Sequence, residues 1–265
     1  MSVYKLSENP KISIVTVSFN QVEYLEICMR SVLEQDYKNI EYLVIDGGST
    51  DGSKAIIEKY SDCLAYWQSQ KDAGQTDAIN QGFARATGEV YAWLNSDDLL
   101  LPGTLRKVVE ALKANPEVGM VYGDCLLINA KGKALGRFPA AQTDYAKLRQ
   151  GYVHIPQQAS FWRAELWKQV APLDPSFYFA MDYDLWVRLA KLAPLRYLPG
   201  EPWAAFRLHG GAKSLAAADR CWPEMMRVHY RDGGSPFSLI NLKYWLRKAA
   251  APLINWRRRR FADRN

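Results

Sequence analysis

The chain has 265 residues, of which 48% are hydrophobic, 12% aromatic and 23% charged, and its formal net charge is +6. This composition is ample for a buried core and excludes global disorder, and the length suits one large domain. Residues 235–265 contain eight Lys or Arg and one Asp, a balance of +7, so residues 1–234 sum to −1. The asymmetry indicates an anionic partner for the end of the chain.

The first half of the chain alternates short apolar strands with amphipathic helices. Strands are predicted at residues 12–18, 41–46, 64–68, 90–94 and 119–122, and helices at 23–34, 53–60, 76–86 and 104–114. The helix over 76–86 is expected to be closed by Gly88. This order predicts a mostly parallel α/β sheet with helices on both faces.

After residue 124 the alternation becomes irregular. Helices are predicted at residues 162–170 and 182–192, and strands at 195–198 and 203–208. We find no internal repeat and no low-complexity linker. The second half is therefore expected to complete the same domain.

The ends of the chain and its cysteines bear on location. The cysteines, Cys28, Cys63, Cys125 and Cys221, form no CxxC pair, which argues against a zinc knuckle and fits a reducing compartment. The N-terminus has no basic segment followed by an apolar run, so we expect no signal peptide. We expect a cytoplasmic protein, peripheral on the inner face of the cell membrane if its tail binds there.

Polar side chains gather at the carboxyl ends of three predicted strands. Ser18 and Asn20 follow the first strand, Asp46 ends the second, and residues 95–98 end the fourth. Ligands of parallel α/β sheets bind at these ends. The three clusters therefore predict one shared crevice.

Asp97 and Asp98 are adjacent carboxylates, which would repel each other if both were buried and unpaired. A divalent cation relieves that repulsion, and Mg²⁺ or Mn²⁺ often binds one or two carboxylates together with substrate phosphates. Such a metal would stabilise charge on a departing diphosphate. A solvated surface pair or a helix cap is the alternative, because adjacent acids are common.

The loop from Asp46 to Gly52 contains three glycines, which permit tight turns, and it leads into a predicted helix whose free amides favour anions. An EF-hand is excluded, because Gly48 and Ile57 stand where cation ligands are required. A plain turn is the alternative.

Four segments in register resemble glycosyltransferase family 2, whose fold is of the GT-A type. They are residues 14–20 (IVTVSFN), 44–53 (VIDGGSTDGS), 72–82 (DAGQTDAINQG) and 94–98 (LNSDD). The resemblance implies a single Rossmann-like domain over 1–234, with a nucleotide-sugar-binding half (10–125) and an acceptor-binding half (126–234). A basic aromatic helical tail over 235–265 would follow it.

The resemblance also assigns roles to positions. It implies a nucleotide-sugar site formed by Thr16, Ser18, Asn20, Asp46, Gln75, Asp77, Asn95 and Asp97. Asp46 would hydrogen-bond the base, and Asp97 would meet the ribose or the donor sugar. Mn²⁺ or Mg²⁺ would be held by Asp98 in a DXD-type motif, with His209 near the metal or diphosphate. One extra Gly after Asp46 departs from the usual family loop and leaves the turn geometry open.

An inverting transfer needs a base that deprotonates the acceptor hydroxyl. The family places an acid before a helix in its second half, and Asp182 matches that position, with Met181 replacing the commoner Glu. Asp184 is a rival. Residues two apart on a helix point to different faces, so only one of the two is expected to face the acceptor. Asp182 could instead serve as a helix cap.

These features predict an inverting, metal-dependent enzyme that moves a sugar from a nucleoside-diphosphate sugar to a glycan or lipid-linked acceptor in surface polysaccharide synthesis. Asp46 is compatible with a pyrimidine imide, which favours a UDP-sugar. Met181 leaves open an inactive nucleotide-sugar-binding or membrane-assembly protein. A sugar-1-phosphate nucleotidyltransferase is a further alternative, but no Gly-rich basic loop follows the first strand.

The tail combines apolar and aromatic residues with cations. Apolar residues cover most of a helix surface over 237–248, and Arg257 to Arg260 follow. Trp and Tyr beside cations suit the surface of an anionic bilayer, where a lipid-carried acceptor would also be found. A packed terminal helix with a solvated end is the main alternative. Arg runs also neutralise phosphates, but we expect no nucleic-acid partner.

Overall fold

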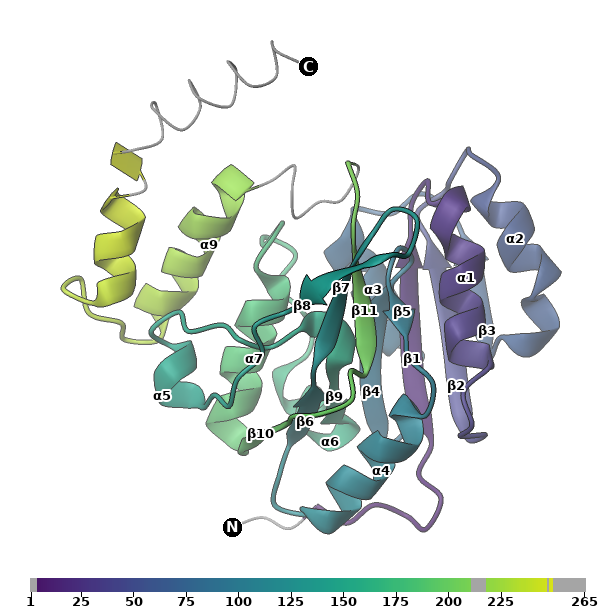
Figure 1. The fold of residues 1–265 in the computed structure, drawn as a ribbon, viewed down its shortest axis with the longest axis horizontal. Helices are drawn as coiled ribbons and strands as arrows, with labels where there is room; N and C mark the ends of the chain where they lie inside the picture. The colour runs from purple at the N-terminus through teal and green to yellow at the C-terminus, as the bar shows by residue number, and fades with distance from the viewer. Residues whose placement is uncertain (1–3, 211–217, 247, 250–265) are drawn as a thin grey trace.

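The computed structural model describes residues 4–210, 218–246 and 248–249. A seven-stranded sheet in the order β10-β6-β9-β4-β1-β2-β3 forms its centre (Figure 1). The strands are β1 (Ile12–Ser18), β2 (Ile40–Asp46), β3 (Tyr66–Ser69), β4 (Val90–Asn95), β6 (Met120–Gly123), β9 (Ser160–Arg163) and β10 (Leu195–Leu198). All pairs are parallel except those of β9, which runs antiparallel to β4 and β6. The predicted mostly parallel α/β sheet is confirmed.

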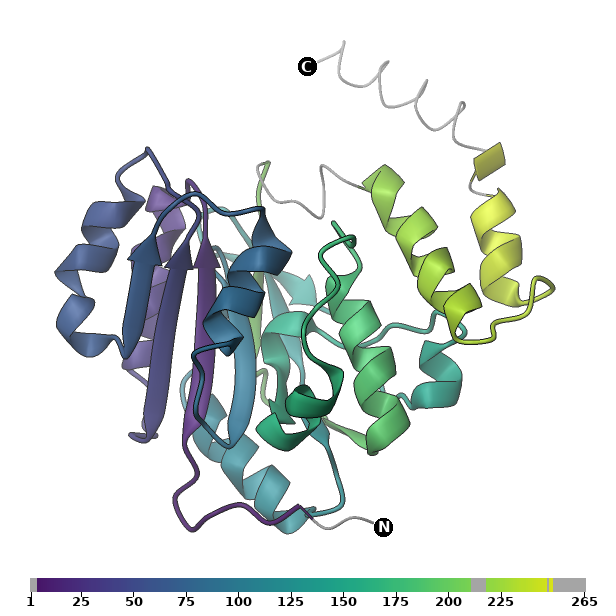
Figure 2. The ribbon, with the colours of Figure 1, turned by 180° about the vertical axis from the view of Figure 1, so that it is seen from behind.

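Helices cover both faces of this sheet. The main ones are α1 (Val22–Leu33), α2 (Ser53–Lys59), α3 (Gln75–Phe83), α4 (Thr104–Ala114), α6 (Ala164–Val170) and α7 (Met181–Leu192). Helices α1, α2 and α4 pack on one face, and α3, α6 and α7 on the other, which is in front in Figure 2. Strand β1 serves both cores, since Ile14 points to the first and Val15 to the second.

A second sheet lies on the α1 and α4 face, with its strands in the order β5-β11-β7-β8. Its strands are β5 (Leu99–Leu100), β7 (Cys125–Asn129), β8 (Ala134–Arg137) and β11 (Ala204–Leu208). Because β5 directly follows Asp98 and pairs with β11, the chain after β11 is held beside the two adjacent carboxylates.

Two predicted elements need correction. The helix expected over 162–170 begins at Ala164, because Trp162 belongs to β9 and pairs with Tyr91 and Met120. The helix expected over 76–86 ends at Phe83, and Gly88 does not close it. A Cβ on Gly88 would lie 2.5 Å from Ser13 Oγ, so this glycine permits close approach to β1.

The end of the described chain forms helices at the edge of the molecule. Helix α9 (Ala218–Arg231) contacts α7, and a helical stretch over 239–246 follows it. Within the part of the chain that the structure describes, no helix is long and apolar enough to cross a bilayer. Arg257 to Arg260 lie outside the described residues, and the boundaries at 125/126 and 234/235 stay predictions.

Candidate active site

The loop after β2 is organised by Asp46. Its side chain is fully buried and accepts hydrogen bonds from Gly48 N (3.2 Å), Ser49 N (2.9 Å), Ser49 Oγ (2.5 Å) and Ser69 Oγ (2.6 Å). Both carboxylate oxygens are therefore occupied within the protein. Contact between Asp46 and a base stays a prediction, and it would require an exchange of these bonds.

The two glycines after Asp46 have different surroundings. A Cβ built on Gly47 would lie 2.9 Å from the end of the Asp72 side chain, while Gly48 has a φ of +81° and a Cβ there would lie 3.0 Å from Lys71 N. Asp72 itself accepts a hydrogen bond from Gly74 N at 2.8 Å. Asp72 thus lies against the end of β2, a neighbour that the sequence did not identify.

The three predicted residues of β1 and its loop separate in space. Thr16 is fully buried and its Oγ1 accepts from Tyr42 OH at 2.9 Å, so it belongs to the core and does not line the crevice. Ser18 is 5% exposed at the strand end, and no described group hydrogen-bonds its Oγ. Asn20 is exposed, and its Oδ1 accepts from Thr50 N at 2.9 Å, which joins the loops after β1 and β2.

Asp51 reinforces this junction. Its carboxylate accepts from Val22 N (2.9 Å), Ser53 N (3.0 Å) and Ser53 Oγ (2.7 Å), and so caps the starts of α1 and α2. Burial alone would raise the pKa of Asp51, but these hydrogen bonds lower it overall. A cavity of about 270 Å³ opens here, lined by Asn20, Gln21, Val22, Glu23, Tyr24, Asp51 and His209.

Asp98 is fully buried below this cavity. Its Oδ1 accepts from Arg207 N (3.0 Å), and its Oδ2 accepts from Gln158 Nε2 (2.9 Å) and Asn95 Nδ2 (3.4 Å). Burial, and secondly the charge of Asp97, raise the pKa of Asp98 well above its usual range, against the effect of these donors. Metal binding by Asp98 stays a prediction, and it would require a cation to displace these donors.

Asp97 is the carboxylate that faces the crevice. Its Oδ2 lies 3.0 Å from His209 Nε2, and the side chains of Asp97 and His209 are 16% and 9% exposed. The His209 ring packs against Tyr24 with the ring centroids 4.8 Å apart. Arg207 holds the segment in place, because its Nε donates to the Asp97 carbonyl at 2.8 Å. His209 thus lies beside Asp97, while its approach to a metal or diphosphate stays a prediction.

This pair suits a divalent cation only with help from substrate. Residues 4–210, 218–246 and 248–249 contain no group of three or more acidic, His or Cys side chains that could hold a metal. One carboxylate oxygen and one imidazole nitrogen fit Mn²⁺ or Mg²⁺ when diphosphate and water complete the coordination shell.

The start of α3 is tied to the end of β4. Gln75 Nε2 donates to Asn95 Oδ1 at 2.8 Å, and Asn95 Nδ2 lies 3.4 Å from Gln157 Oε1. Asp77 Oδ2 accepts from Ala73 N (3.0 Å) and therefore braces the loop before α3. Gln75 and Asn95 thus stand at the crevice, while contact of Gln75, Asp77 and Asn95 with a nucleotide-sugar stays a prediction.

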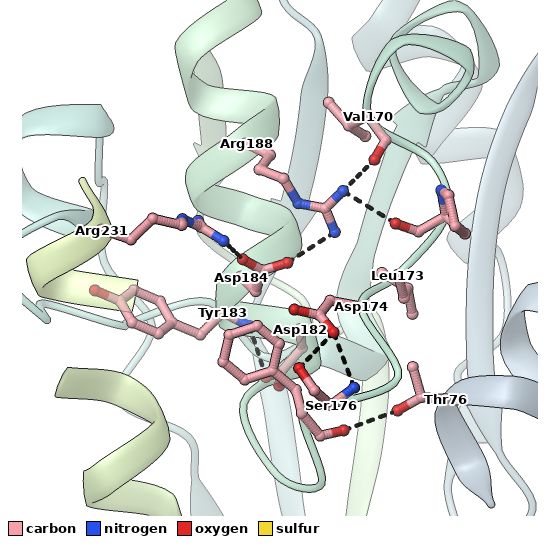
Figure 3. A network of polar contacts seen from close by, with 12 residues as sticks. Thr76, Val170, Leu173, Asp174, Ser176, Asp182, Tyr183, Asp184, Arg188 and Arg231 are labelled. Carbon is pink, nitrogen blue, oxygen red and sulfur yellow. Dashed lines mark hydrogen bonds and ion pairs between the residues drawn. The ribbon is translucent and has the colours of Figure 1, made fainter. Parts of the chain in front are cut away.

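The two candidate bases on α7 have different surroundings (Figure 3). Asp184 is 1% exposed and forms ion pairs with Arg188 (2.8 Å) and Arg231. Both of its carboxylate oxygens are therefore engaged in ion pairs within the protein. Asp182 is partly exposed in the first turn of α7, and its Oδ1 accepts from Tyr183 N at 2.7 Å. Of the two acids, the geometry favours Asp182.

Glu224 of α9 holds the loop that leads to Asp182. Its carboxylate accepts from three consecutive backbone N–H groups, those of Tyr178 (3.0 Å), Phe179 (2.8 Å) and Ala180 (2.8 Å). From α3, Thr76 Oγ1 donates to the carbonyl of Phe177 in the same loop at 3.1 Å. Sequence reasoning missed Glu224 and Gln158, since no local pattern marks a partner that is distant in the chain, and it gave Asp72 no role although Asp72 begins the motif over 72–82.

Comparisons with known proteins agree with this architecture. The sequence profile of glycosyl transferase family 2 matches residues 13–164. An uncharacterized glycosyltransferase of Mycobacterium tuberculosis is 34% identical over 190 residues, covering 70% of this chain and 71% of that protein. An uncharacterized glycosyltransferase of a Nostoc species is 29% identical over 228 residues, covering 78% and 68%.

Solved structures share the fold. The S. aureus TarS chain in complex with UDP-GlcNAc superposes with a TM-score of 0.67 at 17% identity, covering 84% of this chain and 66% of that one. The mannosyltransferase PcManGT from Pyrobaculum calidifontis, in complex with GDP-Man and Mn²⁺, gives a TM-score of 0.67 at 18% identity, covering 92% and 73%. At such identities the likeness concerns the fold, and this chain spans only part of either.

Proposed function

The chain belongs to glycosyl transferase family 2, and from this premise we propose that it is an inverting, metal-dependent transferase. In this proposal it moves a sugar from a nucleoside-diphosphate sugar to a hydroxyl of a glycan or lipid-linked acceptor. The observation that carries the proposal is the Asp97–His209 pair, 3.0 Å apart, beside the cavity at the carboxyl ends of the strands.

The metal proposal moves from Asp98 to Asp97. Asp97 and His209 would hold Mn²⁺ or Mg²⁺ together with the donor diphosphate, while buried Asp98 fixes the backbone beneath them. The chemistry that such a cation supplies is stabilisation of the charge on the departing diphosphate. The PcManGT complex contains Mn²⁺, which supports the choice of cation.

In the proposed reaction Asp182 is the general base. Its carboxylate takes the proton of the acceptor hydroxyl while the hydroxyl oxygen bonds to the anomeric carbon. The bond from that carbon to the diphosphate oxygen breaks on the opposite side, so the anomeric configuration inverts. Partial exposure of Asp182 and the double pairing of Asp184 support this assignment.

The identity of the donor and the cellular setting of the reaction are also proposals. We favour a UDP-sugar, since Asp46 suits a pyrimidine and TarS was solved with UDP-GlcNAc, although PcManGT was solved with GDP-Man. Ser18, with its unpaired hydroxyl, and Asn20 would lie beside the nucleotide. We propose surface polysaccharide assembly at the inner face of the cell membrane as the setting, because the tail is basic and aromatic.

Two variants with a matched control test the mechanism. Asp97→Asn is expected to abolish the Mn²⁺-dependent stabilisation by UDP-, GDP- or dTDP-sugars in a thermal-shift assay. Asp182→Asn should keep that stabilisation and lower the transfer rate by about 100-fold or more. Asp62→Asn, on the exposed turn after α2, should change neither.

Full transfer rates in both Asp97→Asn and Asp182→Asn would disprove the mechanism. Donor binding by the unaltered chain without transfer to any acceptor would instead favour an inactive nucleotide-sugar-binding protein.

A further inference from the structure

The chain between residues 237 and 246 exposes five large apolar side chains. Their exposed fractions are 96% for Phe237, 62% for Leu239, 55% for Leu242, 54% for Trp245 and 61% for Leu246. In the described ranges no other ten-residue stretch exposes as many. Contiguous exposed apolar surface of this kind marks a site of interaction with a protein or a membrane.

The opposite side of the same helical stretch is fixed to the domain. Ile240 and Asn241 are only 6% and 7% exposed. Tyr230 OH of α9 donates to Asn241 Oδ1 at 2.6 Å, and Ser238 Oγ lies 2.9 Å from His229 Nε2. The stretch therefore already has its place on the domain, and its exposed side is a second apolar face.

This second face has helical spacing. Leu239, Leu242 and Leu246 recur at intervals of three and four residues, and Trp245 adjoins them. We call Phe237, Leu239, Leu242, Trp245 and Leu246 the outer face. The stretch that carries it lies at the edge of the molecule beyond α9, at the opposite end from α2 in both ribbon views (Figures 1 and 2).

The charges beside the outer face are positive. Lys243 and Lys248 are exposed on the same stretch, and Lys248 Nζ lies 4.9 Å from the centre of the Trp245 ring. Residues 235–265 carry eight Lys or Arg and one Asp. A second copy meeting this face with its own would bring like charges together, whereas an anionic lipid surface complements them.

We infer that the outer face docks on an anionic lipid bilayer, with its apolar side chains at the headgroup boundary and the neighbouring lysines on lipid phosphates. The biological reason for such docking rests on the proposed function, since a lipid-linked acceptor would be found at that surface. The same α9 that anchors the stretch also carries Glu224, which holds the loop before Asp182. Docking would thus bring the acceptor half of the enzyme to the bilayer.

Vesicle flotation of the full chain tests the inference without donor or acceptor. The chain should float with phosphatidylcholine vesicles that contain phosphatidylglycerol, and about tenfold less with phosphatidylcholine alone or at high salt. Leu242→Glu should lower the partition coefficient by about tenfold or more, because it places a charge in the apolar boundary. Trp245→Glu should do the same.

Leu135→Glu is the matched control, because Leu135 is 57% exposed on β8, close to the 55% of Leu242. It should leave flotation unchanged, and all three variants should keep the melting temperature, since each altered side chain faces solvent. Equal flotation of Leu242→Glu, Trp245→Glu and the unaltered chain would overturn the inference. A solution dimer that Leu242→Glu dissociates would overturn it too, because the outer face would then be a self-association surface.

Flotation and sugar transfer fail independently. If the chain floats with the vesicles but transfers no sugar, the docking surface is supported and the proposed function is not. If it transfers sugar but does not float, the proposed function is supported and the docking surface is not.

Discussion

Two neighbouring aspartates have opposite environments in this protein. Both lie in the turn between β4 and β5, where Asp98 accepts from three hydrogen-bond donors while Asp97 lies beside His209. Asp98 holds together segments that are 60 and 109 residues away in the chain, through Gln158 and Arg207. Asp98 therefore ties two distant segments to this turn, and contact of Asp97 with a ligand stays a proposal.

These different environments predict that substitutions of the two residues lower the free energy of unfolding by different amounts. Asp98→Ala should lower the free energy of unfolding by about 3 kcal/mol or more, because buried donors lose their acceptor. Asp97→Asn keeps an oxygen beside His209 and should change the free energy of unfolding by about 0.5 kcal/mol at most. Urea unfolding of both proteins without nucleotide or metal measures the difference. Equal losses would mean that Asp98 is no more structural than its neighbour.

At the scale of helices and strands, most elements could be predicted, including the short strands β6, β10 and β11, but β5, β7, β8 and β9 could not. Strands β1, β2 and β4 and helices α1, α4 and α7 lie within one or two residues of their predicted bounds, because each carries its own apolar period. Strands β5, β7 and β8 have two to five residues and are defined by their partners. Trp162 reads as part of a helix in isolation and is extended because β4 and β6 pair with it.

The candidate site shows the same limit. Convergence of Asn20, Asp46 and Asp97 follows from the rule that parallel strands end at one edge, and the sequence predicted it. Which aspartate faces outward, and which distant groups hold the loops, depends on tertiary contacts. Glu224 illustrates this, since it lies 44 to 46 residues beyond the amides that it accepts.

Helix α9 is therefore predicted to act on catalysis through position. Glu224→Ala removes the acceptor of three N–H groups in the loop before Asp182, so the proposed base should be displaced. We expect the kcat for transfer to fall by about tenfold or more with an unchanged donor KM. Hydrogen exchange should accelerate at the amides of Tyr178 to Ala180 only. A general loss of stability would instead accelerate exchange throughout the molecule.

Glu224→Gln should show an intermediate loss, because its amide oxygen can still accept from two of the amides. Glu110→Ala, on the exposed side of α4, is the control. Unchanged exchange at Tyr178 to Ala180 in Glu224→Ala would remove Glu224 from this role, whatever happens to activity.

At the scale of the whole molecule, α7 is joined to α9 by ion pairs whose carboxylates are buried. Asp184 of α7 pairs with Arg188 and with Arg231 of α9. Asp232 directly after α9 pairs with Arg231 (2.8 Å) and with Lys191 of α7. Breaking a buried pair by removing one partner's charge is costly, because the other charge is left buried. The contact between α7 and α9 should therefore depend on whether Asp232 is ionised.

The join gives the protein a predictable acid sensitivity. Burial would raise the pKa of Asp232, but the hydrogen bonds from Lys191 and Arg231 lower it overall. A carboxyl whose folded pKa lies below its unfolded value of about 4 contributes stability above that value, and loses it as pH falls through the folded pKa. The free energy of unfolding of the unaltered chain, measured with urea, should therefore fall steeply below about pH 4. Asp232→Asn should be less stable at neutral pH. Its free energy of unfolding should decline less as pH falls, because residue 232 can no longer take up a proton on unfolding. Parallel declines in the two proteins would mean that Asp232 does not link folding to protonation.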